Sequence, residues 1–514
     1  MGGRSVGRVT TDVPPTTGAG LRLDEPAGRW VLAATVLGSA VAFLDATVVN
    51  IALPAIGRDL GASTTGLTWT VNAYALTLAA LVLVGGSLGD RLGRRRVFAV
   101  GVAAFGATSL ACALAPTLEV LVAGRALQGV AAALLTPGAL ALLRATFRPE
   151  DRSRAIGAWS GLAGTAGAVG PLLGGWLVDV ASWRWIFLIN VPVVVVVLAL
   201  TARHVPESRP PASAAAEPLD LGGAALAAVG LGALTFGLSS WAEGGGPRLP
   251  LAAVVVGLLG LAAFLAWEAT RAHPMMPLDL FRARRFSATN LVTFLVYAAL
   301  GGVFFWLGVT LQVVAGRSAL EAGTSLLPVT VLMLLLSPRA GALGDRLGPR
   351  VPMTVGPLVA AVGVALLARI GPDPSYVVDV LLPVTLLGAG LTLTVTPLTA
   401  TALDAVDEAR TGLASGVNNA VARTGGLLLV AALPALVGLG ADGFADPVAL
   451  EAAHRTAMLV CAGALALGGL VAALTLGGSP GGSPGRSRGR DDAAGRRRHC
   501  AVDAAPVGLG DDAR

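Results

Sequence analysis

Residues 86–95 read GSLGDRLGRR, and residues 341–350 read GALGDRLGPR. Each copy carries one aspartate and at least two arginines among glycines, and each lies between two long apolar runs. Because charged side chains are costly inside lipid, each copy predicts a tight turn at a membrane surface. The recurrence of nearly the same ten residues 255 positions apart predicts a chain built from two related halves.

The composition is that of a membrane protein. Of the 514 residues, 54% are hydrophobic and only 13% are charged, which is too few charges for the surface of a soluble globule of this length. All 37 basic residues are arginines, as is typical of a GC-rich bacterial genome. They gather in short segments between apolar runs instead of along one amphipathic face, which argues against nucleic acid as a partner. The expected partner is the lipid bilayer.

Fourteen apolar segments are long enough to cross a bilayer, which takes about 20 mostly apolar residues. None shows the alternation of a lipid-facing β-strand, so the sequence predicts an all-α polytopic membrane protein. The predicted spans are approximately 30–54, 67–88, 97–116, 118–143, 155–178, 183–202, 221–241, 251–268, 287–313, 321–340, 352–370, 379–402, 413–438 and 454–476.

The loops between these spans differ in arginine content. If both termini are cytoplasmic, the six inner loops hold 18 arginines and the seven outer loops hold six. Positive residues are enriched in cytoplasmic loops. We therefore predict a multi-pass protein of the bacterial cell (inner) membrane with both termini in the cytoplasm.

The repeated segment also predicts the domain organisation. It follows the second span of each half only if the second half begins at the ninth span, so the seventh and eighth spans are an insertion. Segments rich in Pro, Gly, Ser and charge cannot bury a core and are expected to be disordered. The predicted parts are a disordered N-terminus (1–28), an N-terminal six-helix half (29–203), a cytoplasmic linker (204–220), the inserted spans (221–268), a cytoplasmic loop (269–286), a C-terminal six-helix half (287–476) and a disordered tail (477–514).

Asp45 is the deepest acid of the predicted spans. It lies in FLDATVVNIALPAI, about fifteen residues into the first span and thus roughly 22 Å along its axis. An ionisable group at this depth is a functional hypothesis by default, and a carboxylate shielded from water can hold and release a proton near neutral pH. The alternative is a packing acid neutralised by a nearby arginine or by Asn50.

Two arginines lie deep within predicted spans, away from the span ends. Arg125 keeps its charge in a protein, so it can tune a carboxylate or hold an anionic group but cannot carry a proton. Gln128 shares its helix face, and a structural polar network is the alternative role. Arg423 lies in SGVNNAVARTGG, beside two asparagines. We predict that Asp45 and Arg125 couple to protons, and that polar residues of a substrate cavity are Asn50, Gln128, Asn418, Asn419 and Arg423.

The fifth span is rich in small residues. Its sequence GLAGTAGAVGPLLGGWL allows close approach of a neighbouring backbone, and Pro171 removes a helical hydrogen bond and permits a bend. Tight packing alone explains this pattern, but in a protein that changes shape the same helix can seal two halves against leaks.

The repeated segments are predicted to act as cytoplasmic gates. Asp90 can pair with arginines or with the N-terminus of an adjacent helix and so lock the inner faces of the bundle together. Such a latch must break when the cytoplasmic side opens. The first gate comprises Gly86, Asp90, Arg91, Gly93, Arg94 and Arg95, and the second comprises Gly341, Asp345, Arg346 and Gly348.

Several of these stretches resemble motifs of the major facilitator superfamily. GSLGDRLGRRRVF (86–98) is similar to the loop signature of that family, and GRALQGVAAALLTP is similar to its helix-4 arginine motif, with Arg125 in the arginine position. LDATVVNIALPAI and WRWIFLINVP resemble the fourteen-helix drug:proton antiporter branch, the EmrB/QacA type. GAVGPLLGG resembles the antiporter motif of helix 5, which is matched at Gly157, Gly170, Pro171, Gly174 and Gly175.

The resemblance implies a major facilitator fold of two six-helix halves with two extra central helices. It also implies a proton-driven exporter, with Asp45 in the position linked to proton and cation handling. Two departures are visible: Ala166 stands where the helix-5 pattern has glycine, and Pro349 replaces a basic residue in the second gate.

We therefore predict a monomeric drug:proton antiporter that exports lipophilic small molecules, with multidrug or antibiotic efflux as its role. The alternatives are a dedicated exporter of one natural product, amino acid or lipid, and a sensor or scaffold that does not transport. An enzyme is not expected, since the sequence has no G-x-x-x-x-G-K-[ST] loop for ATP and no nucleophile or metal constellation. No cofactor and no metal are expected.

Overall fold

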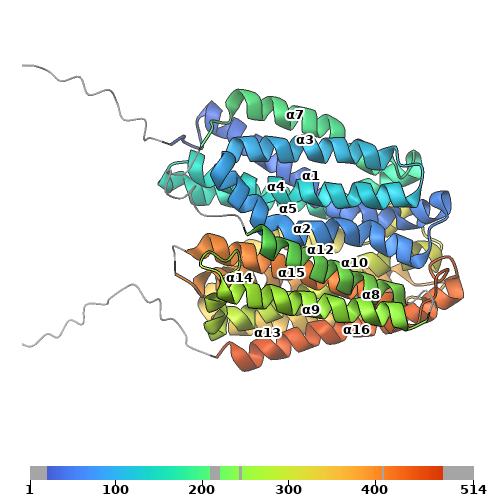
Figure 1. Ribbon diagram of the computed structural model, residues 1–514. Coiled ribbons are helices and arrows are strands. Elements are labelled where there is room, and N and C mark those ends of the chain that lie inside the picture. The colour runs from blue at the N-terminus through green and yellow to red at the C-terminus, as the bar shows by residue number, and fades with distance from the viewer. Residues whose placement is uncertain (1–19, 209–219, 242–245, 408–409, 478–514) are drawn as a thin grey trace, which may run out of the picture. The chain divides into compact units, whose positions relative to one another are not determined.

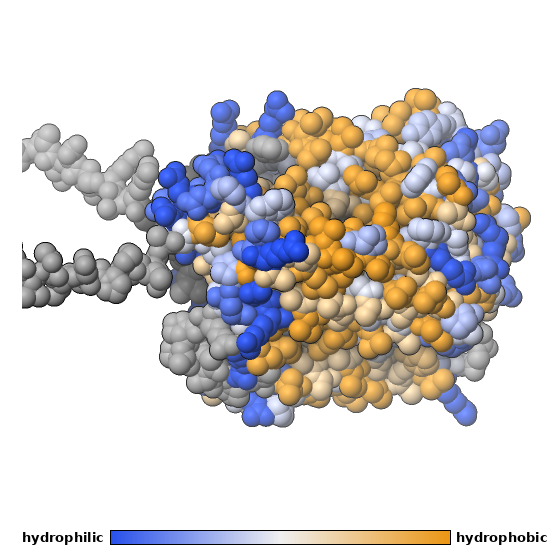
Figure 2. Space-filling view, turned by 90° about the horizontal axis from the view of Figure 1, so that it is seen from above, coloured by the Kyte–Doolittle hydropathy of each residue, from blue (hydrophilic) through white to orange (hydrophobic). Residues whose placement is uncertain are grey.

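The computed structural model describes residues 20–208, 220–241, 246–407 and 410–477. The chain divides into residues 1–478 and 479–514, and the second unit lies wholly outside the described residues. In the described part, fourteen helices are long and apolar enough to cross a membrane, which confirms the all-α prediction. Figure 2 shows apolar side chains around the middle of the bundle and hydrophilic ones gathered toward its two ends, as a surface surrounded by lipid requires.

The helices form two groups of six spans and an inserted pair (Figure 1). In the N-terminal half these are α1 (Pro26–Leu60), α2 (Thr64–Leu92), α3 (Arg94–Ala113), α4 (Leu118–Thr146), α5 (Pro149–Val180), and α6 (Trp185–Leu188) with α7 (Asn190–His204). The inserted pair is α8 (Leu221–Ser240) and α9 (Arg248–Thr270). The C-terminal half contains α10 (Arg284–Val313), α11 (Ala319–Thr324) with α12 (Leu327–Leu347), α13 (Arg350–Leu367), η4 (Tyr376–Leu381) with α14 (Leu382–Asp404), α15 (Thr411–Leu436) and α16 (Pro447–Thr475).

Successive spans alternate in direction, so each lies antiparallel to the one before it. We call the end of the bundle at which α1 begins and α16 ends the terminal end, and the opposite end the far end. The inserted hairpin of α8 and α9 contacts α2 and α15, one helix from each half. The insertion therefore lies against the seam between the halves.

Local sequence signals fix where many helices begin. The Ser63 hydroxyl accepts a hydrogen bond from the Gly66 amide at the start of α2, and Asp446 caps α16 in the same manner. Ser318 and Glu321 form a reciprocal capping box on α11. Such caps satisfy amides that have no partner within the helix, which matters most where a helix starts at the edge of an apolar medium.

Glycine lets α2 and α4 pack backbone to backbone. A Cβ added at Gly85 would lie 2.0 Å from the Ala133 carbonyl oxygen, and one at Gly129 would lie 2.3 Å from the Tyr74 carbonyl oxygen. No side chain fits at these distances, so only glycine allows this approach.

Replacement of neighbouring glycines of α2 is expected to have opposite effects. Gly85→Ala forces α2 away from α4 and should cost about 1–3 kcal/mol of stability. Gly86→Ala is the matched control, since its nearest neighbour would be the Pro137 Cβ at 3.7 Å, and alanine should gain up to about 1 kcal/mol of helix propensity. Thermal loss of the helical circular dichroism signal in detergent measures both. Equal midpoints for the two variants would contradict the close α2–α4 packing.

The apolar core is continuous between the halves at the far end. A cluster in the N-terminal half is built around Phe98, Phe105 and Leu142. The larger cluster joins Leu53 and Ile56 of α1 to residues of α10 and α16 in the other half. Burial of shared apolar surface is the main force that holds the halves together there.

The repeated segments are helix ends and not turns, which corrects the sequence interpretation. GSLGDRL is the last part of α2 and GALGDRL is the last part of α12. The chain turns only at the following residues, Gly93 with φ of 103° and Gly348 with φ of 75°. These values lie in the region that favours glycine. The charged residues extend a helix to the membrane surface and do not need a loop to reach water.

Two segments expected to be disordered are partly ordered. In the N-terminus, residues 20–28 are described: the Leu21 amide donates to the Thr146 carbonyl at 2.8 Å, and α1 already begins at Pro26. In the linker, Glu207 accepts a hydrogen bond from the Arg95 amide at 3.2 Å at the start of α3. A carboxylate at a helix N-terminus is favourable. The other residues of the two predicted disordered segments and of the linker, 1–19, 209–219 and 478–514, lie outside the described residues.

The expected cytoplasmic loop 269–286 also contains structure. It includes a short 3₁₀ helix, η3 (Leu278–Arg282), and α10 begins before the loop was predicted to end. Asp279 of η3 pairs with Arg410 beside α15, and this guanidinium holds the pKa of the Asp279 carboxyl below its usual range. Both side chains are about half exposed, so water screens the pair.

Candidate functional site

The deepest charges of the N-terminal half form a buried ion pair. Asp45 of α1 is 0% exposed and Arg125 of α4 is 1% exposed. Their side chains are joined by an ion pair that is also a hydrogen bond from Nη1 of Arg125 to Oδ2 of Asp45. Two charges removed from water stabilise each other only while both are present. The structure thus brings together the two residues for which a shared role was predicted.

Neutral polar groups complete this network. Gln128 Nε2 donates to Oδ1 of Asp45 at 2.9 Å and to the Ser109 hydroxyl at 2.8 Å, and Asn190 Nδ2 donates to the same carboxylate oxygen at 3.3 Å. Arg125 Nη1 also donates to Gln128 Oε1 at 2.7 Å, and its Nε donates to the Thr70 carbonyl at 3.0 Å. The network thus joins α1 to four other spans: α4 and α7 donate directly to the carboxylate, and α2 and α3 bond to Arg125 and Gln128.

An aromatic ring covers one face of the guanidinium. The Arg125 Cζ lies 4.5 Å from the centroid of the Tyr74 ring, a distance at which a cation is attracted to the ring face. Sequence reasoning did not find Ser109, Asn190 or Tyr74 as members of the network. One sequence feature pointed to Asn190: it lies in the stretch WRWIFLINVP, which resembles the antiporter branch.

A cavity of about 310 Å³ lies between the two halves. Helices α1 and α5 supply one wall, and α10, α12 and α14 supply the other. Asn50 is on this wall, and its side-chain oxygen has no hydrogen-bond partner among the described residues. The lining is mainly apolar with a few polar groups, which suits a lipophilic ligand. The lining residues are Thr47, Asn50, Ile51, Gly164, Gly167, Pro171, Tyr297, Leu300, Phe304, Leu326, Val329, Thr330, Met333, Leu391 and Val395.

Helix α1 connects the cavity to the ion pair. Thr47 is two residues from Asp45, lies on the cavity wall, and donates from its hydroxyl to the Gly167 carbonyl of α5 at 2.8 Å. Helix α1 therefore carries a side chain that lines the cavity and, two residues away, the carboxylate of the buried ion pair.

Helix α5 is buried near the far end and open near the terminal end. A Cβ at Gly175 would lie 2.3 Å from the Ala319 carbonyl oxygen of α11, and one at Gly323 of α11 would lie 2.2 Å from the Pro171 carbonyl oxygen. Asp179 also accepts hydrogen bonds from the Ala319 and Leu320 amides at 3.2 and 2.8 Å. The two halves are in backbone contact here.

Other far-end contacts strengthen this closure. The Thr64 amide donates to the Ala441 carbonyl at 2.7 Å, and Gln312 Nε2 donates to the Ile51 carbonyl at 2.9 Å. Toward the terminal end, by contrast, Gly157, Gly161 and Gly164 of α5 are exposed and face open space. We call this arrangement the far-closed state.

The helix-5 motif therefore combines different contacts. Gly170 and Gly174 pack against Thr47 and Val48 of α1 within the N-terminal half, whereas Gly175 packs against the other half. Gly157 contacts neither. The sequence pattern predicted a sealing helix but did not separate these roles.

The predicted latch at Asp90 does not cross between the halves. Its carboxylate accepts from Arg94 Nε at 2.9 Å, and Arg94 Nη2 lies 2.8 Å from the same oxygen, so the pair joins α2 to the adjacent α3. Arg95 donates to the Ala202 carbonyl at 2.9 Å, again within the N-terminal half. In the far-closed state the first gate thus stiffens one half. In the second gate, the side chain of Asp345 lies outside the described part of the structure.

Three of the predicted cavity residues are not part of the lining of this 310 Å³ cavity. Gln128 is fully buried in the ion-pair network. Asn418 donates to Asn290 and Thr293 of α10, at 3.1 and 2.8 Å, and so ties two helices of one half. Asn419 is exposed and donates to a carbonyl of its own helix. Helical periodicity predicts which residues share a helix face but not which neighbouring helix or cavity that face contacts.

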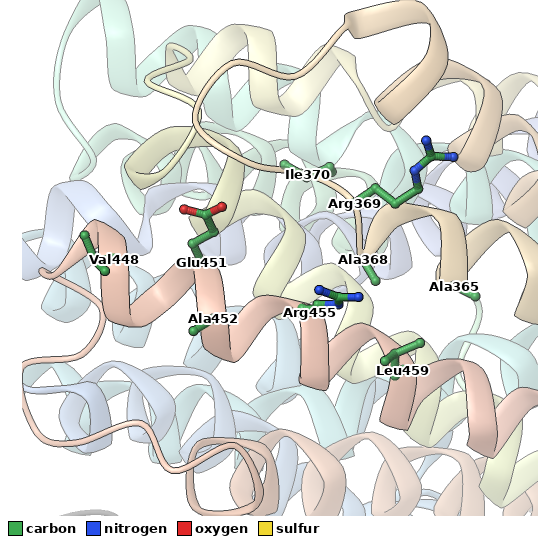
Figure 3. A pocket seen from close by; sticks show the side chains of 9 residues that line it. All are labelled: Ala365, Ala368, Arg369, Ile370, Val448, Glu451, Ala452, Arg455 and Leu459. Carbon is green, nitrogen blue, oxygen red and sulfur yellow. The ribbon is translucent and has the colours of Figure 1, made fainter.

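A larger groove in the described part is lined partly by exposed charged side chains. The groove between α13 and α16 at the far end is about 590 Å³ (Figure 3). Arg369, Arg455 and Glu451 project along it, and both arginines are exposed. Exposed arginines at the ends of spans are usual at a membrane surface. Among the described residues, no group of three or more His, Cys, Asp or Glu is placed to hold a metal ion.

Fourteen spans in two halves around a cavity define a membrane transporter fold. The family model of the Major Facilitator Superfamily matches residues 35–431, and the chain belongs to this family. Among solved structures, a bacterial homolog of the human lysosomal transporter Spinster, in an inward-facing and unoccupied conformation, has a TM-score of 0.63 at 18% identity, covering 88% of this chain and 97% of that one. At this identity the likeness concerns the fold alone.

Similar sequences include proteins of antibiotic resistance. The tetracenomycin C resistance and export protein of Streptomyces glaucescens is 36% identical over 429 residues, which cover 83% of this chain and 78% of that protein. The puromycin resistance protein pur8 of Streptomyces alboniger is 37% identical and covers 82% of this chain and 84% of its own. The multidrug resistance protein Stp of Mycobacterium tuberculosis is 36% identical, with coverage of 76% and 72%.

Proposed function

We propose that this protein is a proton-coupled exporter of lipophilic small molecules that works by alternating access as a monomer. The names of its relatives, which concern resistance to or export of tetracenomycin C, puromycin and multiple drugs, support antibiotic or multidrug efflux. The arginine content of the loops supports a place in the bacterial cell membrane with both termini in the cytoplasm. The far-closed state is then the inward-open state.

One observation carries the proposal. The Asp45–Arg125 pair is buried in α1 and α4, and Thr47 on the same helix lines the cavity between the halves. A proton that binds Asp45 removes its charge and leaves Arg125 without its partner, which is costly in a dry interior. Protonation of the carboxylate therefore destabilises this arrangement and favours a rearrangement of the halves.

The cycle follows from this geometry. In the inward-open state Asp45 has released its proton to the cytoplasm and is paired with Arg125, and the substrate enters the cavity from the terminal end. When the far end opens, the substrate leaves and Asp45 takes a proton from outside. The protonated carrier returns and releases the proton inside, so substrate and proton move in opposite directions.

Drug accumulation in cells tests the proposal. In a bacterial strain that lacks its main efflux pumps, cells with this protein should accumulate less of some lipophilic antibiotics and dyes than cells with an empty vector, and a protonophore should abolish the difference. A response to a single compound would favour a dedicated exporter. Equal accumulation of every compound, with the protein present in the membrane, would contradict efflux.

A further inference from the structure

Arg423 occupies an unusual place for a charged residue. It lies twelve residues after Thr411 in α15, which has 26 residues, so it sits about 18 Å along the helix, near its middle. Helix α15 packs against α2, α8 and α10. Gly416, two turns earlier on the same face, meets Leu83 of α2. Arg423 therefore points toward the seam between the halves at mid-depth.

No partner among the described residues neutralises this guanidinium. Arg423 is half-buried, and no described carboxylate or carbonyl forms an ion pair or a hydrogen bond with it. Arg125, the other mid-depth arginine, has a carboxylate, an amide oxygen and a carbonyl as partners. Charged groups inside a membrane normally pair with each other or line a site or pathway. Because Arg423 has no partner among the described residues, the second alternative applies: it lines a site or a pathway.

The surroundings of Arg423 connect it to the cavity. Gly426, three residues after Arg423 in α15, lies against α10 at Tyr297, since a Cβ added there would lie 3.5 Å from the Tyr297 carbonyl oxygen. The charge of Arg423 also acts on the half-buried Tyr297 phenol. Tyr297 is part of the cavity lining. A ligand that fills the cavity beside Tyr297 therefore lies within the electrostatic range of Arg423, and in an apolar surrounding such an interaction is strong.

The described lining of the cavity holds no carboxylate that could balance a positive ligand. Asp45, the nearby acid, is fully buried in the N-terminal half and both of its oxygens accept hydrogen bonds there. A cation in the cavity would meet the unpaired charge of Arg423, whereas an anion would supply the partner that this charge lacks.

We propose that Arg423 is the anion-binding residue of the central cavity, and that the cargo is a lipophilic molecule with an acidic group, such as a phenolate, an enolate or a carboxylate. This inference rests on the proposed export function and narrows it. The guanidinium binds the acidic group through charge-assisted hydrogen bonds, and the apolar lining accepts the rest of the molecule.

Three dyes of related size test the charge preference: fluorescein, which is anionic at neutral pH, rhodamine 6G, which is cationic, and the neutral dye Nile red. Fluorescence anisotropy with the purified protein in nanodiscs at pH 7.5 gives their affinities. Fluorescein should bind more tightly than rhodamine 6G. In Arg423→Gln its affinity should fall about 10-fold or more, in Arg423→Lys it should fall less, and Nile red should bind all three proteins alike.

Stability separates ligand binding from a structural role. Because Arg423 has no partner among the described residues, Arg423→Gln should unfold at the same temperature as the wild type or higher in the absence of dye. Fluorescein should raise the unfolding temperature of the wild type alone. Arg125→Gln is the matched control and should be less stable. A clear loss of stability in Arg423→Gln would assign Arg423 to the structure and overturn the proposal.

The outcomes also distinguish this inference from the export function. If the wild type binds and exports Nile red but fluorescein affinity does not depend on Arg423, or if rhodamine 6G binds more tightly than fluorescein, the anion site is wrong and the exporter stands. If the wild type neither binds nor exports any of the three dyes, the result contradicts both proposals.

Discussion

An Asp45→Asn variant is expected to lose concentrative export: in inside-out vesicles, pH-driven drug uptake should fall to the level of vesicles without the protein. An amide cannot take up and release a proton in the neutral pH range, so the exchange has no coupling group. The substitution also leaves Arg125 buried without its carboxylate, which typically costs about 3–5 kcal/mol. Uptake and thermal unfolding should be measured on the same preparations.

The double variant Asp45→Asn with Arg125→Gln is the decisive control. It removes both buried charges and leaves neutral groups that hydrogen-bond with Gln128 and Asn190. Replacement of a whole buried ion pair is often close to neutral for stability, so this variant should recover most of the lost unfolding temperature without recovering pH-driven uptake. Uptake at the wild-type level in the double variant would show that Asp45 does not carry the proton.

The second large effect is expected at the far-end seal. Gly175→Ala places a methyl group 2.3 Å from the Ala319 carbonyl oxygen, closer than atoms can approach, so α5 and α11 cannot close. Export should be lost, and the equilibrium should shift away from the far-closed state. Gly161→Ala on the same helix is the matched control, because its Cβ would face open space in this state and the residue is not part of the cavity lining.

Labelling from the two sides of the membrane measures this shift. Thr47→Cys places a thiol on the cavity wall, while the native Cys112 and Cys461 are buried and Cys500→Ser removes the cysteine of the tail. A membrane-impermeant maleimide should label Thr47→Cys mainly from the terminal end. With Gly175→Ala added, labelling from the far end should rise. If far-end labelling and export are both unchanged, α5 and α11 do not form the seal.

The sequence was a good guide where each span could be judged alone. Length and hydropathy predicted the fourteen spans, and the repeat predicted two halves with an insertion, because both depend on local composition. The depths of Asp45 and Arg125 marked them in the same way. Their contact, and the third partner Gln128, follow from helical spacing and from the cost of an unpaired charge in lipid.

Features that depend on how the helices are rotated relative to one another were harder to predict from the sequence. Asn418 and Asn419 are neighbours of Arg423 in the sequence, but one ties α15 to α10 and the other is exposed. The Asp90 carboxylate pairs with Arg94 of the adjacent α3, within the same half. No sequence pattern specifies which conformational state of the transporter a structure shows. The repeated segment predicts a turn of ten residues, whereas the chain turns at Gly93, a single residue with positive φ.

The most direct test of the account is proton movement caused by substrate. Purified protein in proteoliposomes with an acidic interior and a pH-sensitive dye inside should release protons when an exported compound is added outside to the face that corresponds to the cytoplasm. The account predicts release that depends on the compound in the wild type and no release with Asp45→Asn and Arg125→Gln together. Export of the compound without any proton movement, or equal proton release in the double variant, would contradict proton-coupled antiport through Asp45.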